Sequence, residues 1–308
     1  MQFIHQLRPL DVDTKDRPLW SGHTRVRRNS ALRALHYEEL AGGWRVAQFR
    51  ALGGPWELHL PPESSAAPTA IASVAAQEAW RIERKFSVYL ADSVIGRIQL
   101  SRGTEFEVDT ETAALIDFGQ HCYEASDGLI DITFGARARG MRLLDCDADG
   151  YRLSAQPNPV VGFDKLRWRR PYLLLPQGME LDFGWFLKFY AVDRIFEQLA
   201  VAPSALFLVQ APGALRAPRR QAIGGWGAAV NRAAPIKADF VSGSLVTSAA
   251  VEVLSPRSAL LVPGAPRSVT VASGSCMDAG VVARLALLQG ADAADFLHLQ
   301  GRRHWIVN

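Results

Sequence analysis

The chain has 308 residues, of which 48% are hydrophobic and 21% are charged, a composition typical of a globular protein with one large or two modest cores. Lysine and arginine total 34 against 31 for aspartate and glutamate, and this balance of +3 argues against both a nucleic-acid-binding protein and an acidic solvating protein. Short basic clusters at residues 167–170 and 216–220 are interpreted as solvated edges, with a phosphate- or partner-binding patch as the alternative.

Cysteine usage and hydropathy indicate in which cellular compartment the protein is expected. Cys122, Cys146 and Cys276 form no CxxC pair and no framework for disulfides, which is typical of a reducing environment. The first ten residues have no long apolar stretch and no small-residue cleavage site, and no run of about 18 apolar residues occurs in the chain. We therefore expect a cytoplasmic protein without a membrane span.

The first half of the chain begins with residues 1–48, which are rich in Arg and His and weakly periodic. They are predicted to form an N-terminal extension of strands and loops before a domain at 49–308. Residues 56–60 alternate like a half-buried strand that Pro61 and Pro62 interrupt. The Ala-rich stretch 69–84 has helical spacing and is predicted to be a helix.

Capping signals define the next helices. Asp109 is placed to cap a helix that runs to about Glu124, with Glu111 near its positive end. Ser126-Asp127-Gly128 is expected to end this helix. Short strands are predicted within 150–182 and 204–272, and helices over 186–199 and 278–288. Because helices and strands do not alternate strictly, the chain is predicted to be α+β with mostly antiparallel sheets.

Common catalytic signatures are absent from the sequence. It contains no GxSxG, no HExxH and no GxxxxGK[ST] segment. The seven histidines are scattered, and none are spaced by three or four residues, so no zinc site is expected from local spacing.

Five dispersed segments, taken in order, instead resemble the motifs of the ApbE-type FAD:protein FMN transferases. They are Leu52-Gly53-Gly54-Pro55-Trp56, Phe86-Ser87-Val88-Tyr89 with Asp92-Ser93, Ser126-Asp127-Gly128-Leu129-Ile130-Asp131-Ile132-Thr133, the stretch 182–193, and the stretch from Ser268-Val269-Thr270-Val271 through Met277-Asp278-Ala279 to Gly290. Together they cover about 50–300, which makes the resemblance specific although each motif alone is short.

The resemblance implies a two-part α+β fold, ApbE-like and T-fold-like, with mostly antiparallel sheets flanked by helices. It implies FAD as flavin donor, Mg²⁺ as cofactor, and a flavoprotein acceptor whose Ser or Thr hydroxyl receives FMN as AMP is released. Such chemistry needs a metal that neutralises the negative charge of the pyrophosphate oxygens, and a group that takes the proton of the acceptor hydroxyl.

Matching positions carry over the family's site residues to this sequence. Asp278 matches the metal-binding Asp, and Leu187 falls where a backbone carbonyl completes the metal site. Tyr89 and Asp182 match flavin-contacting residues, and Glu252 falls where the family has a His that is a candidate acid or base. The other predicted cofactor contacts lie within the matched segments, except for Thr247, which begins a Thr247-Ser248-Ala249 stretch that resembles the family's Thr-Ser-Gly. They are Asp131, Thr133, Lys188 and Thr247.

Several positions depart from the family pattern. Val282 replaces a metal-binding Thr, and a valine offers no oxygen to Mg²⁺. Trp185 and Phe189 replace glycines at the turn before the predicted third helix, where glycine lets backbone approach a ligand. These two rings are expected either to fill a vacated pocket or to stack on a flavin.

The predicted site residues also have structural interpretations. Asp278 is either a cation ligand or a favourable carboxylate at a helix start. Asp131 and Asp182 contact a ligand or shape turns, Lys188 reaches a phosphate or stabilises its turn, and Tyr89 lines a cofactor site or belongs to the core. Two functions follow: a divergent FMN transferase, or a catalytically inactive relative acting as a binding or accessory protein.

Overall fold

The computed structural model describes residues 34–65, 67–134, 160–201, 206–218, 242–250, 253 and 262–308. Its main element is an eight-stranded sheet in which every pairing is antiparallel. In sheet order the strands are β1 (His36–Leu40), β2 (Trp44–Ala51), β3 (Gly54–Leu60), β7 (Leu208–Ala211), β8 (Ala214–Ala217), β9 (Gly243–Ala249), β10 (Ser268–Ser273) and β11 (His304–Val307). The α+β prediction with mostly antiparallel sheets is confirmed.

The long connection from β3 to β7 contains most of the helices and a small second sheet. That sheet has the order β4 (Glu105–Glu107), β6 (Tyr172–Leu174), β5 (Arg167–Arg169). The helices are α1 (Pro68–Phe86), α2 (Val94–Leu100), α3 (Thr110–Ala125), α5 (Gly184–Leu199), α6 (Cys276–Leu288) and α7 (Ala293–Gln300), with short 3₁₀ turns η2 (Ala41–Gly43), η3 (Phe163–Lys165) and η5 (Gly290–Asp292).

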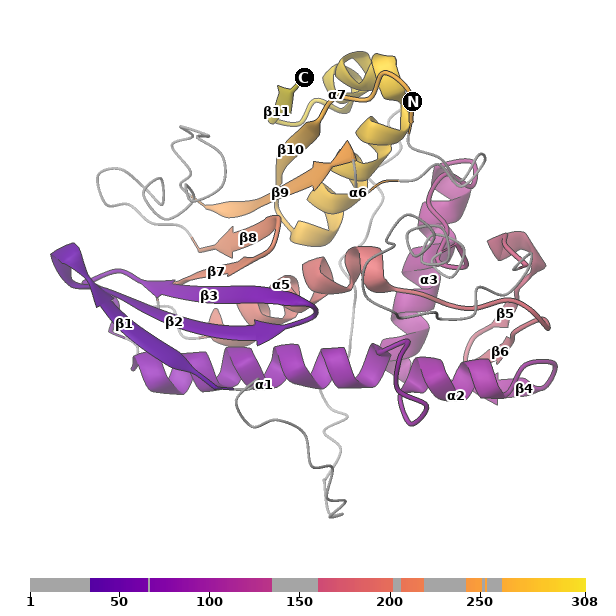
Figure 1. Cartoon of the computed structure of the whole chain (residues 1–308), viewed down its shortest axis with the longest axis horizontal. Coiled ribbons are helices and arrows are strands. Elements are labelled where there is room, and N and C mark those ends of the chain that lie inside the picture. Colours follow the sequence, from indigo (N-terminus) through magenta and orange to yellow (C-terminus); the bar gives the residue numbers. More distant parts are fainter. Residues whose placement is uncertain are drawn as a thin grey trace, which may run out of the picture.

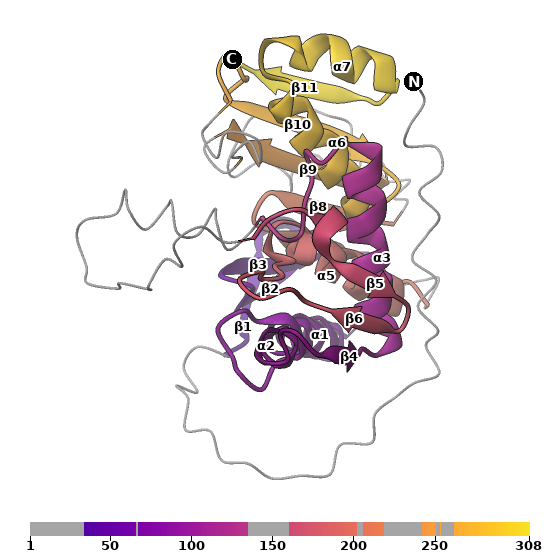
Figure 2. The ribbon, with the colours of Figure 1, turned by 90° about the vertical axis from the view of Figure 1, so that its right-hand side faces the viewer.

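Helix α5 lies at the centre of the helical layer. It packs between α1, which lies along β1–β3, and α6, which lies along β9 and β10 (Figure 1). Helix α3 and the small sheet lie on the side that faces the viewer in Figure 2. The apolar faces of these helices and the inner face of the sheet share one large core.

The predicted caps account for the helix bounds. The Asp109 carboxylate accepts the Thr112 N–H at the start of α3 (3.1 Å), and the helix ends before Ser126 as expected. Helix α6 begins two residues before the predicted Asp278, because the Ser275 hydroxyl caps it by accepting the Asp278 N–H at 3.2 Å.

The N-terminal part of the described chain joins the main sheet. The predicted boundary at residue 48 falls inside β2, where Gln48 pairs with Glu57 of β3. Strand β3 is more buried than its alternation predicts. His59 is only 6% exposed, because its cross-strand neighbour Leu208 belongs to a second apolar cluster on the sheet.

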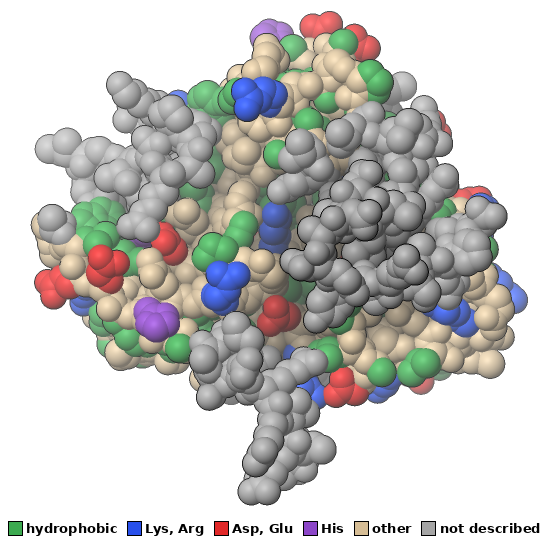
Figure 3. Space-filling view, viewed as in Figure 1, with side chains coloured by type: hydrophobic (Ala, Val, Ile, Leu, Met, Phe, Trp, Pro, Cys, Tyr) green, Lys and Arg blue, Asp and Glu red, His purple; other side chains and the backbone are tan. Residues whose placement is uncertain are grey.

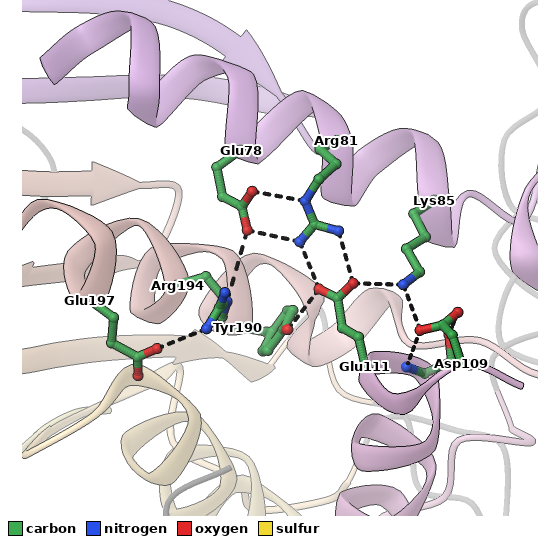
Figure 4. Close-up of polar contacts among 9 residues, drawn as sticks. Glu78, Arg81, Lys85, Asp109, Glu111, Tyr190, Arg194 and Glu197 are labelled. Atoms are coloured by element: carbon green, nitrogen blue, oxygen red, sulfur yellow. Dashed lines mark hydrogen bonds and ion pairs between the residues drawn. The ribbon is translucent and has the colours of Figure 1, made fainter. Parts of the chain in front are cut away.

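An ion-pair network joins α1, α3 and α5 (Figure 4). Arg81 of α1 donates to Glu78 and, through both terminal nitrogens, to the Glu111 carboxylate of α3 (2.7 and 2.8 Å). Glu111 also accepts from Lys85 and from the Tyr190 hydroxyl of α5, at 2.7 and 2.8 Å. The predicted helix-start carboxylate thus fixes three helices against one another.

Side chains of both charge signs lie on the face of the molecule drawn in Figure 3. On the face in Figure 3, basic side chains outside the grey areas lie singly among other types, as the near-balanced composition predicts. None of the described helices combines the length and apolarity that a membrane crossing requires.

Candidate functional site

Two of the predicted cofactor-binding segments meet in a turn cluster beside α5. The Asp182 N–H donates to the Ile132 carbonyl at 2.8 Å, so the segment just before α5 lies against the loop after α3. The Asp131 carboxylate accepts both the N–H (2.8 Å) and the hydroxyl (2.7 Å) of Thr133, and that hydroxyl accepts the Gly162 N–H at 2.8 Å. Three distant segments therefore converge at Asp131 and Thr133.

Asp131 in this cluster is buried, and Asp182 is partly exposed. Burial raises the pKa of Asp131, while the two hydrogen bonds from Thr133 act in the opposite direction. Asp182 accepts the Gly184 N–H at 2.7 Å where α5 begins, and a Cβ at position 184 would lie 2.8 Å from its carboxylate. A side chain at position 184 would therefore displace the Asp182 carboxylate, and the turn interpretation of Asp182 has a direct structural basis.

Lys188 and Thr247 meet at the tight turn between β7 and β8. Gly213 in this turn has φ +72°, and a Cβ there would lie 3.9 Å from the Lys188 Nζ and 2.8 Å from the Thr247 carbonyl oxygen. The Thr247 N–H donates to the Gly213 carbonyl (2.8 Å), and its hydroxyl hydrogen-bonds the Thr270 hydroxyl (2.8 Å). These two predicted contacts thus form a second small group.

Tyr89 lies in the loop between α1 and α2 with 73% of its surface exposed. The interpretation of this ring as a core residue is therefore wrong, because its loop carries it into solvent. The loop is held by Ser93, whose hydroxyl donates to the Ser87 carbonyl (2.6 Å) and accepts the Gly96 N–H (2.8 Å). The contact of Tyr89 with a cofactor stays a prediction.

The bulky residues of the α5 turn pack against α6. A Cβ on Gly280 would lie 2.4 Å from the Phe189 ring, so ring and glycine are in direct contact. One turn away on each helix, the Arg284 guanidinium lies 5.3 Å from the centre of the Trp185 ring. Both replacements thus have matching residues on α6, which favours the filled-pocket interpretation over stacking on a flavin. We call this contact the α5–α6 seam.

Asp278 is engaged by groups of the protein itself. Its Oδ2 accepts from the Ser273 hydroxyl in a short hydrogen bond and lies 2.8 Å from Nη1 of Arg302. The same Arg302 nitrogen donates to the Ser273 hydroxyl oxygen at 2.8 Å. Oδ1 of Asp278 is buried and has no hydrogen-bond partner among the described residues. Three side chains from β10, α6 and the approach to β11 thus form a closed triangle.

The metal that the resemblance implies does not fit the described residues. One oxygen of Asp278 is unpartnered, but Val282 on the next turn of α6 is fully buried and apolar. Leu187, the predicted backbone ligand, is the fourth residue of α5 and its side chain is buried. No group of three His, Cys, Asp or Glu side chains suited to a metal occurs in the described part of the chain. Magnesium needs near-octahedral oxygen ligands, and these residues offer one carboxylate that an arginine already neutralises.

Two acidic residues remain, Glu252, which was predicted, and Asp193, which was not. Glu252, the predicted acid or base, lies outside the described residues. Asp193 received no role from the sequence, although it closes the 182–193 motif. It is 5% exposed, and its carboxylate accepts the N–H groups of Cys276 and Met277 (2.9 Å each) and pairs with Arg216 (2.7 Å). The sequence signal that could have indicated it is its place at the end of that matched motif.

Comparisons with known proteins identify the family and the fold of the chain. The family model described as the ApbE family matches residues 52–304. No curated protein matches the chain significantly. The structure is similar to an ApbE protein from Thermotoga maritima, with 21% identity, 88% of this chain and 94% of that chain covered, and a TM-score of 0.68.

Two further solved structures show the same fold. The flavinyl transferase ApbE from Pseudomonas stutzeri, in its apo form, is 17% identical over 89% of this chain and 93% of its own, with a TM-score of 0.69. The flavin transferase ApbE from Vibrio cholerae is 16% identical over 88% of this chain and 94% of its own, with a TM-score of 0.66.

Proposed function

Because the chain belongs to the ApbE family, we propose that it is a flavin transferase-like protein that has lost metal-dependent transfer of FMN. In this proposal it acts in the cytoplasm as a binding or accessory protein toward FAD and a flavoprotein. The family membership supports the flavin, and the altered site residues support the loss of transfer.

The observation that carries the proposal is the state of Asp278. A carboxylate that serves a divalent cation needs open oxygens and further oxygen ligands beside it. Here one oxygen is bound by Ser273 and Arg302, and the residue one turn later is Val282. Loss of several ligands together lowers the affinity for the metal far more than one substitution does, since every ligand contributes to the binding of the same ion.

A second candidate is an active FAD:protein FMN transferase that modifies a Ser or Thr of a flavoprotein. It is favoured by the turn cluster, in which Asp131, Thr133 and Asp182 match the family and lie together. In that case water and substrate would supply the missing metal ligands, and Glu252 would serve as the base.

Calorimetric titration with FAD, in Mg²⁺ and in EDTA, separates the two candidates. We expect FAD to bind with equal affinity in both conditions, and Asp182→Ala to weaken binding because Asp182 lies in the turn cluster. The exposed Asp295 of α7, changed to Asn, is the matched control for losing a carboxylate. Binding that requires Mg²⁺, followed by covalent transfer of FMN to an acceptor peptide, would favour the second candidate. Absence of FAD binding would remove the flavin from the proposal.

A further inference from the structure

Arg302 lies beside the end of β10, because the neighbouring Arg303 carbonyl accepts the Ala272 N–H at 2.9 Å. It precedes edge strand β11, which pairs with β10, and β10 leads into α6. This pairing places the guanidinium above the first turn of α6, where its Nη1 contacts both Asp278 and Ser273 at 2.8 Å. Side-chain exposure is 25% for Arg302 and 15% for Asp278, so the pair is largely removed from solvent.

The first turn of α6 does not need Asp278 as its cap. The Asp193 carboxylate accepts the N–H groups of Cys276 and Met277, and the Ser275 hydroxyl accepts the Asp278 N–H. The side chain of Asp278 is therefore held by a separate set of contacts. Among the described residues, its electrostatic partner is a cation that the chain itself provides.

A guanidinium and a divalent cation compete for such a carboxylate. Arginine carries its charge at all ordinary pH values, and at hydrogen-bond distance it neutralises the Asp278 charge that would attract a metal. A metal on the unpartnered Oδ1 would also lie close to the fixed positive charge of Arg302, in surroundings that screen this repulsion less than water does.

We infer that Arg302 is an internal cation that takes the place of a divalent metal at Asp278 and keeps metal ions out of this position. The inference rests on the proposed function in one respect, since that function assigns the ancestral metal to Asp278. It predicts a latent metal site, which removal of the guanidinium charge and addition of one oxygen ligand would restore.

The test measures Mn²⁺ binding by electron paramagnetic resonance in the absence of flavin. The double variant Arg302→Gln with Val282→Thr removes the charge, keeps a polar side chain, and adds a hydroxyl one turn from Asp278. We expect it to bind Mn²⁺ roughly tenfold or more tightly than the wild type, with circular dichroism verifying its fold. Adding Asp278→Asn should abolish the gain.

The matched control is Arg303→Gln with Val282→Thr. Arg303 is adjacent, carries the same charge and lies over the Trp305 ring instead of Asp278, so this variant should gain no Mn²⁺ affinity. An equal gain in both double variants would overturn the inference, since net charge alone would then explain it. A folded Arg302 variant without any gain would also overturn it.

Mn²⁺ binding to the wild type is an independent measurement, because the wild type carries no substitution that could disturb its fold. Mn²⁺ binding to the wild type that Asp278→Asn removes would overturn the inference directly. Because no flavin is present, these outcomes are separate from the FAD titration. FAD could fail to bind, ending the flavin proposal, while the role of Arg302 is still decided by Mn²⁺.

Discussion

Helix α5 contacts its neighbours through two faces of different chemistry. Each face carries two aromatic side chains and one charged side chain, but the face toward α1 and α3 makes a hydrogen bond or ion pair at two of its three residues, and the face toward α6 packs through both of its rings. The first carries Phe186, Tyr190 and Arg194, and the second carries Trp185, Phe189 and Asp193. Each set has the four-residue spacing that places side chains along one side of a helix.

The difference shows which residues of the 182–193 motif are explained by the positioning of α5 in the fold. Tyr190 and Asp193 match the family's sequence, and each makes polar contacts that fix α5 to a neighbour. Trp185 and Phe189 depart from the family and pack against complementary residues of α6. The second half of the motif is therefore explained by helix positioning, whereas the first half contains the two departures from the family, and both of these side chains contact α6.

The largest expected effect is at Asp193, the polar anchor of the α6 face. Asp193→Ala should destabilise the protein by about 3–5 kcal/mol, because it leaves the buried Arg216 charge without its carboxylate. Two N–H groups at the start of α6 also lose their acceptor. Urea unfolding measures the loss. Asp193→Asn keeps the size and one acceptor oxygen, and should cost less. An alanine variant as stable as the wild type would contradict the anchoring role.

The other face of α5 should respond to acid through Glu111. Burial acts to raise the pKa of Glu111, but the contacts with Arg81 and Lys85 outweigh it and hold this pKa at about 2, against 4.5 ordinarily. A lowered pKa in the folded state means that the stabilisation is complete above pH 4.5 and is lost as pH falls toward about 2. The full shift corresponds to about 3 kcal/mol.

Urea unfolding of Glu111→Gln and wild type between pH 7 and pH 2.5 tests this expectation. The wild type should be more stable at neutral pH, and the gap should narrow below pH 4.5 as Glu111 takes up its proton. The exposed Glu124 on the same helix, changed to Gln, controls for the loss of one charge. A gap that stays constant through the acid range would show that the network does not depend on the Glu111 charge.

Features set by local sequence could be predicted, whereas contacts across the fold could not. Asp109 caps α3 and Gly128 follows its end because capping and chain reversal depend on neighbouring residues. The pairing of Asp278 with Arg302 depends on the register of β10 with β11, and β11 is an edge strand of only four residues. Helices α2 and α7 were missed because each spans only about two turns, too few to show a period.

In the candidate site, too, matched residues could be predicted from the sequence, whereas contacts between distant segments could not. The resemblance indicated Asp131, Thr133 and Asp182, and the structure brings these residues together. It could not show that Trp185 and Phe189 have partners on α6, because such complementarity appears only when the two helices are packed. A glycine at position 280 carries no signal of the ring it accommodates.

The smallest expected effect, and the most specific for the α5–α6 seam, is at Gly280. In the wild type, Gly280→Ala should cost about 1–3 kcal/mol, because the new methyl group would lie 2.4 Å from the Phe189 ring. In a Phe189→Ala background that obstacle is gone, and the same change should instead stabilise the helix by up to about 1 kcal/mol. Urea unfolding of the four proteins gives the coupling between the two positions.

The sign of this coupling decides between the two interpretations of Phe189. A ring packed in the seam makes the effect of Gly280→Ala reverse when the ring is removed, because one contact causes the cost. A ring that is free to turn toward a flavin would tolerate the methyl group, and Gly280→Ala would then have nearly the same effect in both backgrounds. Equal effects would therefore contradict the filled-pocket interpretation and would favour stacking of the Phe189 ring on a flavin.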